Sequence, residues 1–216
     1  MTEQTLISLF DSIPTWVMLL PIFICSIMLL AVFAERMVFL KNIKIDYRLF
    51  IMGITSKLSE ESIESALSLC AGYKGPIIDM VKKILGSWND IGDIEIRVRD
   101  ISETAIRAIE RFGTLVGTIG TVSPMFGLLG TVTGMMKSFS GLAKIGPSSQ
   151  NLLAQGITEA LITTAFGLMV AIPAIIFYNY LVAKVEQYTR EIEYVTNVLL
   201  ETKESIDLEK KANVVV

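Results

Sequence analysis

Three long stretches of this chain contain almost no Lys, Arg, Asp or Glu. They are Ser12–Ala34, Phe112–Met136 and Ile145–Ala183, and the last contains a single charged residue, Glu159. About 20 consecutive apolar residues cross the hydrocarbon core of a bilayer as an α-helix, so each stretch can hold one crossing. An apolar content of 52% and only 19% charged residues are typical of a membrane protein. The sequence therefore predicts an all-α integral membrane protein with three transmembrane helices.

The basic residues predict the orientation of these helices. Most of the 19 Lys and Arg residues lie in Glu35–Arg111, more follow from Lys184 onward, and residues 1–11 have none. Short flanking segments rich in Lys and Arg stay on the cytoplasmic side. The first apolar stretch lacks a basic n-region and a small-x-small cleavage motif, so we expect it to be a retained anchor. The expected order is 1–11 outside, 12–34 transmembrane, 35–111 cytoplasmic helical domain, 112–136 transmembrane, 137–150 outside loop, 151–183 transmembrane and 184–216 cytoplasmic tail.

The composition argues against several functional classes. A net charge of −3 without a concentrated basic stripe gives little basis for nucleic-acid binding. Cys25 lies in the first span and Cys70 in the cytoplasmic segment, so a disulfide between them is not expected. The chain has no His and no paired cysteines, which predicts no metal site, and we expect no cofactor. No nucleophile, base and orienting group converge, so an enzyme is not expected.

Two apolar stripes predict that the second and third helices extend into the cytoplasmic domain. In each stripe the apolar residues recur at steps of three and four, the spacing of one helix face. Gly and Pro in the run Gly72–Pro76 predict a turn within the cytoplasmic segment. The two stripes are Ile94, Val98, Ile101, Ala105, Ala108 and Phe112, and Leu181, Val185, Tyr188, Ile192, Val195 and Leu199.

Small residues form one face of each of the last two spans. Such faces let helix backbones approach closely, which promotes helix association in lipid. In the second span the face also carries Thr131, whose hydroxyl can bond its own helix backbone or serve a polar pathway. The small faces comprise Gly113, Gly117, Gly120, Ser123, Gly127, Gly130 and Gly134 in the second span, and Gly156, Ala160, Thr163, Gly167, Ala171 and Ala174 in the third.

Glu159 is the candidate functional carboxylate. An ionisable side chain inside a membrane-length apolar segment is by default a functional-site hypothesis, because a centrally placed charge costs roughly 2.5 to 3.5 kcal/mol even on lenient insertion scales. Thr163 lies four residues later, close enough for a hydrogen bond to Glu159, and Thr164 lies on the opposite margin of the small face. Two readings stay open: a solvated interfacial carboxylate, or a protonatable group in a polar cleft that needs an acidic partner.

At these residues the chain resembles a known family. The runs Ser123–Phe139 (SPMFGLLGTVTGMMKSF) and Gly156–Tyr180 (GITEALITTAFGLMVAIPAIIFYNY) resemble the core of the ExbB/TolQ proton channels, related more distantly to the flagellar stator subunit MotA. The resemblance extends to the pair Glu35-Arg36 after the first span and to the break at Gly75-Pro76. Three predicted spans, rather than four, argue against the flagellar branch.

The resemblance implies a pentamer in the bacterial inner membrane, with a periplasmic N-terminus and a cytoplasmic C-terminus. Its second and third helices would line a pore around single-span partners of the ExbD/TolR type, which supply an aspartate. Thr131, Glu159 and Thr164 correspond to the residues of the family's proton path, and the role of Thr163 stays open. The partners would transmit force to a TonB- or TolA-like protein for energised outer-membrane transport or envelope maintenance.

Alternatives remain at this point. The compact N-terminus favours the ExbB-like branch over the TolQ-like one, although both stay open. Sodium is an alternative ion, because Thr131, Thr163 and Thr164 could supply oxygen ligands. A membrane scaffold that assembles through its glycine faces and conducts nothing is the alternative function, and we expect it to tolerate Glu159→Gln.

Overall fold

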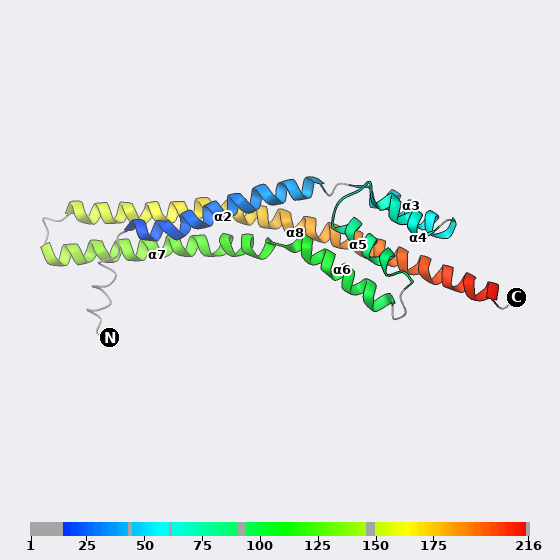
Figure 1. Cartoon of the computed structure of the whole chain (residues 1–216). Helices are drawn as coiled ribbons and strands as arrows, with labels where there is room; N and C mark the ends of the chain where they lie inside the picture. Colours follow the sequence, from blue (N-terminus) through cyan, green and yellow to red (C-terminus); the bar gives the residue numbers. More distant parts are fainter. Residues whose placement is uncertain (1–14, 43–44, 61, 90–93, 146–149, 215–216) are drawn as a thin grey trace. The chain divides into compact units, whose positions relative to one another are not determined.

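A computed structural model describes residues 15–42, 45–60, 62–89, 94–145 and 150–214 of the chain (Figure 1). The expected outside segment 1–11 and the residues 146–149 lie outside these ranges. Within them, the regular elements are all α-helices. They are α2 (Thr15–Asn42), α3 (Tyr47–Glu60), α4 (Ile63–Cys70), α5 (Pro76–Gly86), α6 (Ile94–Glu110), α7 (Gly113–Ile145) and α8 (Gln150–Val214).

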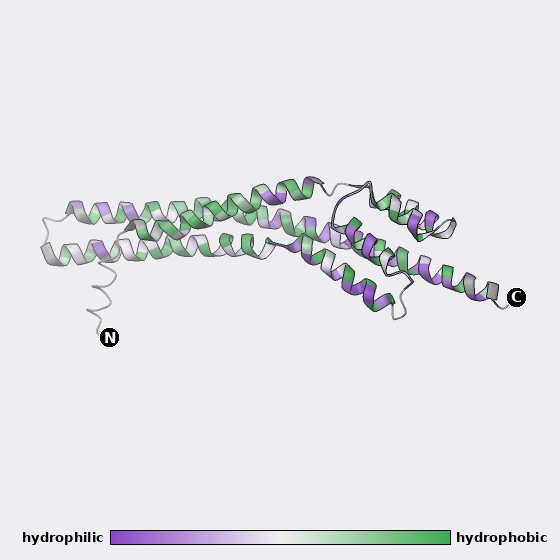
Figure 2. Ribbon diagram, viewed as in Figure 1, coloured by the Kyte–Doolittle hydropathy of each residue, from purple (hydrophilic) through white to green (hydrophobic). Residues whose placement is uncertain are grey.

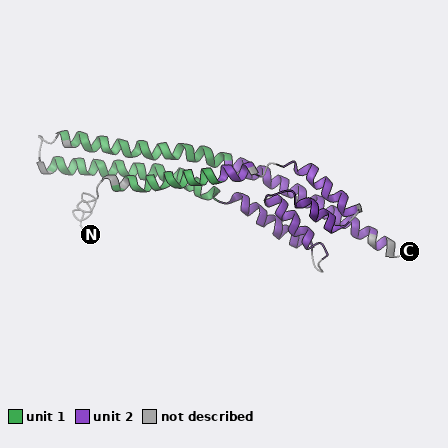
Figure 3. Cartoon of the chain, turned by 45° about the horizontal axis from the view of Figure 1, so that its top comes forward, with its two compact units in different colours: residues 1–35, 112–180 green, residues 36–111, 181–216 purple. Residues whose placement is uncertain are grey.

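Three helical stretches are long and apolar enough to cross a membrane, namely Leu19–Lys41, Ile94–Ala143, which a two-residue turn interrupts, and Leu153–Glu209. The prediction of an all-α protein with three candidate spans is therefore confirmed. The chain divides into two compact units, which Figure 3 colours separately. Unit 1 consists of residues up to Glu35 and Phe112–Tyr180, and unit 2 consists of Arg36–Arg111 and the chain from Leu181 onward.

Unit 1 contains most of α2, all of α7 and the first half of α8. Its helices consist mainly of hydrophobic residues, as Figure 2 shows. Large apolar side chains such as Leu128, Met169 and Ile176 are exposed, with exposed fractions of 63 to 65%. Phe33 of α2 meets Phe177 of α8 edge to face, with ring centroids 4.8 Å apart. This surface suits lipid or other apolar helices rather than water.

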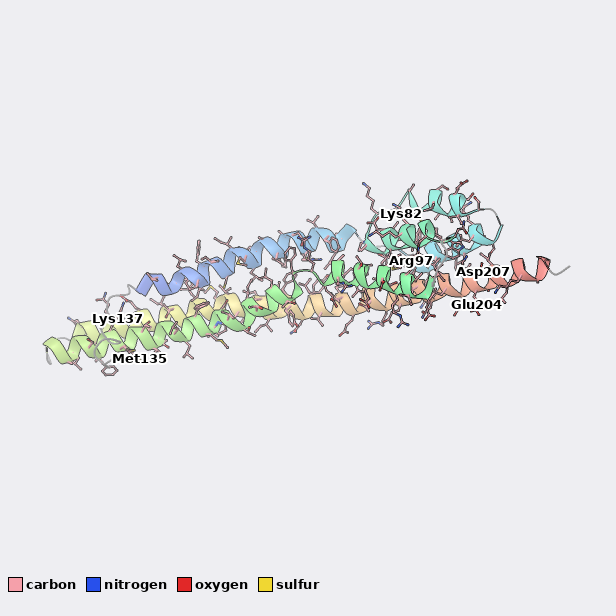
Figure 4. The ribbon with its side chains drawn as sticks, turned by 60° about the horizontal axis from the view of Figure 1, so that its bottom comes forward. Lys82, Arg97, Met135, Lys137, Glu204 and Asp207 are labelled. Carbon is pink, nitrogen blue, oxygen red and sulfur yellow. The ribbon has the colours of Figure 1, made fainter. Side chains whose placement is uncertain are left out.

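The loop expected at residues 137–150 is mostly helical. α7 continues to Ile145, and Lys137, expected at the start of the loop, lies on this helix near Met135 (Figure 4). Between residues 137 and 145 the only strong helix-disfavouring residue is Gly141, and one glycine costs a helix only about 1 kcal/mol. The prediction was wrong here because the end of an apolar segment does not end a helix.

The second helix is not continuous into the cytoplasmic segment. α6 ends at Glu110, α7 begins at Gly113, and Arg111 and Phe112 between them form a turn. Phe112 has φ 68°, in the left-handed region, which costs a non-glycine residue of the order of 1–2 kcal/mol. The apolar stripe predicted a helix that runs through this point, because side-chain periodicity carries no information on a single backbone dihedral.

Unit 2 contains α3 to α6 and the second half of α8, around an aliphatic core. α5 packs against α4 and α6, and α4 packs against α3. The turn expected at Gly72–Pro76 separates α4 from α5, and Gly75 adopts φ 140° there, a conformation that suits glycine. The stripe predicted from Leu181 to Leu199 is buried at most of its positions. The fully buried residues of unit 2 include Ile51, Ile54, Ile77, Ile78, Val81, Ile84, Leu85, Ile192, Val195 and Leu199.

Candidate functional site

The predicted site lies on α7 and α8 within unit 1, where small residues bring the two backbones together. A Cβ atom added to Gly127 would lie 3.0 Å from Thr164 Cα and 3.4 Å from Gly167 Cα. A Cβ added to Gly167 would lie 2.7 Å from the carbonyl oxygen of Ser123. Contacts below 3.0 Å are not tolerated without a shift, so glycine is needed for this close approach.

Gly134 and Gly156 form a second close approach along the same two helices. A Cβ on Gly134 would meet Ala160 Cβ at 2.9 Å, and a Cβ on Gly156 would overlap Ser138 Oγ. The five glycines that the sequence marks for helix packing, Gly127, Gly130, Gly134, Gly156 and Gly167, all lie against the facing helix.

Thr163 fills the space that Gly130 leaves. Its exposed fraction is 1%, and a Cβ on Gly130 would overlap its Oγ1. The Thr163 hydroxyl donates to Ala160 O at 2.7 Å. Because a hydroxyl has one proton, Thr163 is not a donor to Glu159, contrary to the bond expected from their spacing. Thr163 therefore lies inside the helix contact.

Thr164 links the two helices directly. Its Oγ1 donates to Gly127 O on α7 at 3.0 Å, and the side chain is partly buried. The close approach at Gly127 makes this bond possible, because a Cβ there would already lie 3.0 Å from Thr164 Cα and 3.1 Å from Thr163 O. The Thr164 oxygen keeps lone pairs that can accept a further hydrogen bond.

Thr131 and Glu159 are more accessible than Thr163. Thr131 is partly buried and donates to Leu128 O at 2.7 Å within α7. Glu159 is partly buried beside the buried Ala160, and its Oε1 accepts from Gln155 Nε2 at 3.2 Å. Gln155 was not singled out from the sequence, although its spacing of four from Glu159 is the usual signal for such a pair.

Buried hydroxyls in α7 were also not predicted as site residues. Ser138 donates to Gly134 O at 3.0 Å, and Thr133 donates to Gly130 O at 3.1 Å. Ser123 is fully buried, and its Oγ has no hydrogen-bond partner within the described part of the chain. Ser123 belongs to the small face of the second span, but its size alone did not distinguish it from the glycines.

The site offers one carboxylate and several hydroxyls. Within the described ranges, no group of three or more His, Cys, Asp or Glu residues could hold a metal ion. The hydroxyl protons of Thr131, Thr163 and Thr164 are directed at backbone carbonyls. Glu159 is thus the one ionisable side chain among the predicted site residues.

Comparison with known proteins places the chain in a family. Residues 76–194, more than half of the chain, match the model of the MotA/TolQ/ExbB proton channel family. The biopolymer transport protein ExbB of Salmonella typhimurium is 38% identical over 81 residues, which cover 37% of this chain and 33% of that protein. The Tol-Pal system protein TolQ of Pseudomonas aeruginosa is 51% identical over 53 residues, which cover 24% of this chain and 23% of that protein.

The aligned regions thus span about a third or less of these curated relatives. The family match covers all of α5, α6 and α7 and the first two thirds of α8, and therefore includes every candidate site residue. With its three apolar helices, the chain is a multi-pass inner-membrane protein. It belongs to the MotA/TolQ/ExbB proton channel family.

Proposed function

We propose that this chain is the proton-channel subunit of an inner-membrane motor of the ExbB-ExbD or TolQ-TolR type. In this proposal several copies, a pentamer by resemblance, surround a pore that α7 and α8 line. Glu159 binds the proton, and Thr131, Thr163 and Thr164 contribute to the polar pathway. Motion of the partner inside the ring would pass to a TonB- or TolA-like protein, which energises outer-membrane transport or maintains the envelope.

The observation that carries the proposal is the placement of Glu159. It is the only acidic residue between Arg111 and Lys184, and it lies on α8 next to the residues that pack against α7. Lipid disfavours a charge at such a place, so Glu159 is expected to face water or protein. A carboxylate held on a rigid helix pair is a suitable site for reversible proton binding.

A partner is part of the proposal because the pathway has one acidic residue. A proton relay between two compartments needs a second group that accepts the proton. A single-span subunit of the ExbD or TolR type would supply an aspartate. Movement of one charge across 100 mV yields about 2.3 kcal/mol, so several protons per mechanical cycle are expected.

The test is activity that depends on the proton motive force in cells that co-express the partner. Glu159→Gln and Thr164→Val should each abolish or strongly impair activity while the amount of assembled oligomer stays unchanged. Glu186→Gln and Thr158→Val are the matched controls: Glu186 is exposed on α8, and Thr158 is exposed and bonds Ala154 O. Full activity of Glu159→Gln would contradict the proposal.

One observation favours a non-conducting scaffold as the second candidate. Thr163 and the glycines of α7 and α8 act in helix packing, and the hydroxyls of Thr131, Thr163 and Thr164 donate to backbone carbonyls. A scaffold needs only this close contact. It predicts that Glu159→Gln leaves activity intact, whereas Gly127→Leu abolishes assembly, so the same assays separate the two functions.

A further inference from the structure

Arg36, near the end of α2 in unit 2, is a buried charge that the proposed pathway does not use. Its exposed fraction is 2%. Burial of a guanidinium is strongly unfavourable unless hydrogen bonds or charges compensate it. Nη1 donates to the carbonyl oxygen of Ile109 at 3.3 Å, and Cζ lies 4.9 Å from the centroid of the Phe39 ring. Both contacts lie within unit 2.

The acceptor is at the C-terminus of α6. This helix ends at Glu110, one residue after Ile109. The last four carbonyls of an α-helix have no intrahelical donor, and the negative end of the helix dipole lies there. A cation that donates to one of these carbonyls satisfies it and interacts favourably with the dipole. Arg36 is therefore a C-terminal cap of α6, supplied from a residue far away in the sequence.

The cap lies directly before the turn to α7. Arg111 and Phe112 form this turn, and Phe112 is held in the left-handed region at φ 68°. An aromatic residue adopts such a conformation only where its surroundings enforce it. The chain passes between the two units at Glu35/Arg36, at Arg111/Phe112 and at Tyr180/Leu181. The hydrogen bond from Arg36 to Ile109 thus joins, inside unit 2, the chain segments next to the first two of these passages.

We propose that Arg36 is a positioning residue of the motor: it caps α6, fixes the turn at Arg111 and Phe112, and so keeps α7 mechanically coupled to unit 2. Without the cap, the last turn of α6 frays and takes up a displacement of α7 instead of transmitting it. This role rests on the proposed function, whereas the cap itself does not.

The first test measures the turn directly, on the full chain purified with its ExbD-type partner. Trypsin cleaves after Arg111, which is exposed, and mass spectrometry follows the appearance of the peptide end at this residue. Arg36→Gln should raise the cleavage rate roughly tenfold or more, because a hydrogen bond from a charged donor is lost. The control is Arg107→Gln, which removes an exposed pair with Glu103 and should change the rate by less than about twofold.

The second test measures coupling, as activity driven by the proton motive force at matched oligomer levels. Arg36→Gln should lose activity, and Arg36→Lys should recover part of it, because lysine retains the charge but lacks the fork of the guanidinium. If Arg36→Gln does not accumulate in the membrane, the cleavage rate and the activity of Arg36→Lys test the proposal instead. If Arg36→Gln is cleaved after Arg111 at the wild-type rate, Arg36 does not act as the cap of α6.

Two further outcomes separate a specific action on the turn from general unfolding, and the cap from the positioning role. Equal acceleration of cleavage after Arg111 and after Arg190 in α8 would show general unfolding of unit 2 and overturn a specific action on the turn. Rapid cleavage at Arg111 with full activity in Arg36→Gln would overturn the positioning role. Failure of the proposed function looks different: Glu159→Gln would then be fully active, while cleavage at Arg111 would still report the cap.

Discussion

Thr164 on α8 donates its hydroxyl proton to the carbonyl oxygen of Gly127 on α7, with 3.0 Å between the two oxygens. The bond forms where a Cβ on Gly127 would lie only 3.0 Å from Thr164 Cα. Thr164 is thus a predicted pathway residue and also a direct link between two helices. A loss of activity on its substitution has to be separated from a loss of helix packing.

A comparison of Thr164→Val with Thr164→Ser separates these effects. Valine keeps the shape but removes the donor, so we expect a loss of about 0.5–1.5 kcal/mol in stability, and serine should retain most of it. Thermal unfolding of the purified complex in detergent measures the difference. An unchanged melting temperature in Thr164→Val would mean that the bond contributes nothing, and any loss of activity would then belong to the pathway.

The contact between Gly130 and Thr163 predicts a compensating pair. Gly130→Ala places a methyl group against the Thr163 hydroxyl and should destabilise the helix contact by about 1–3 kcal/mol. Thr163→Ala in the same chain removes the obstruction and should recover much of this loss. Melting temperatures of the two single variants and the double variant measure the coupling.

Gly141→Ala is the control for this pair. Gly141 also lies in α7, but a Cβ there would meet nothing within 4 Å. Alanine favours helix over glycine by up to about 1 kcal/mol, so this variant should be as stable as the wild type or more stable. Destabilisation by Gly141→Ala equal to that by Gly130→Ala would contradict the packing explanation.

Tyr47 in unit 2 predicts a loss of stability at high pH. Burial raises the pKa of Tyr47 above its ordinary value, and Tyr188 and Glu191 raise it further. The unfolded chain therefore releases this proton from about pH 10 upward while the folded chain retains it. Its contribution to stability is complete below pH 10 and is lost as the pH rises further.

The measurement compares denaturant unfolding of the wild type with that of Tyr47→Phe between pH 8 and pH 11. The wild type should lose more stability over this range, since phenylalanine has no proton to release. Identical pH profiles would show that Tyr47 ionises in the folded chain as easily as in the unfolded one.

Cys70 predicts slow thiol labelling. Its side chain is fully buried, and burial raises the pKa of its thiol, although Lys82 acts in the opposite direction. The thiolate is the reactive form, so maleimide should react with folded Cys70 at least about ten times more slowly than with the unfolded chain. Cys25→Ser leaves Cys70 as the only cysteine for this measurement. Equally fast labelling before and after unfolding would show that the core of unit 2 is open.

The parts of the fold that follow from the sequence are those that depend on local interactions rather than on contacts between distant residues. Gaps in charge predict the three spans, since a charge in lipid is unfavourable wherever the rest of the chain lies. Periodicity likewise predicts the buried stripe of α8 through Tyr188, Ile192 and Leu199. The spacing of the glycines predicts the small faces of α7 and α8, but not which residue of one helix meets which residue of the other.

The sequence by itself determined the helical membrane class, the small faces and Glu159 as the single acidic residue of the spans. Only the tertiary structure decided that Thr164 bonds Gly127, that Thr163 lies against Gly130, and that Arg36 caps α6 at Ile109. Local patterns record which environment each side chain prefers. A contact between residues that are distant in the chain depends on the backbone around both, including the left-handed turn at Phe112 that no pattern of side chains encodes.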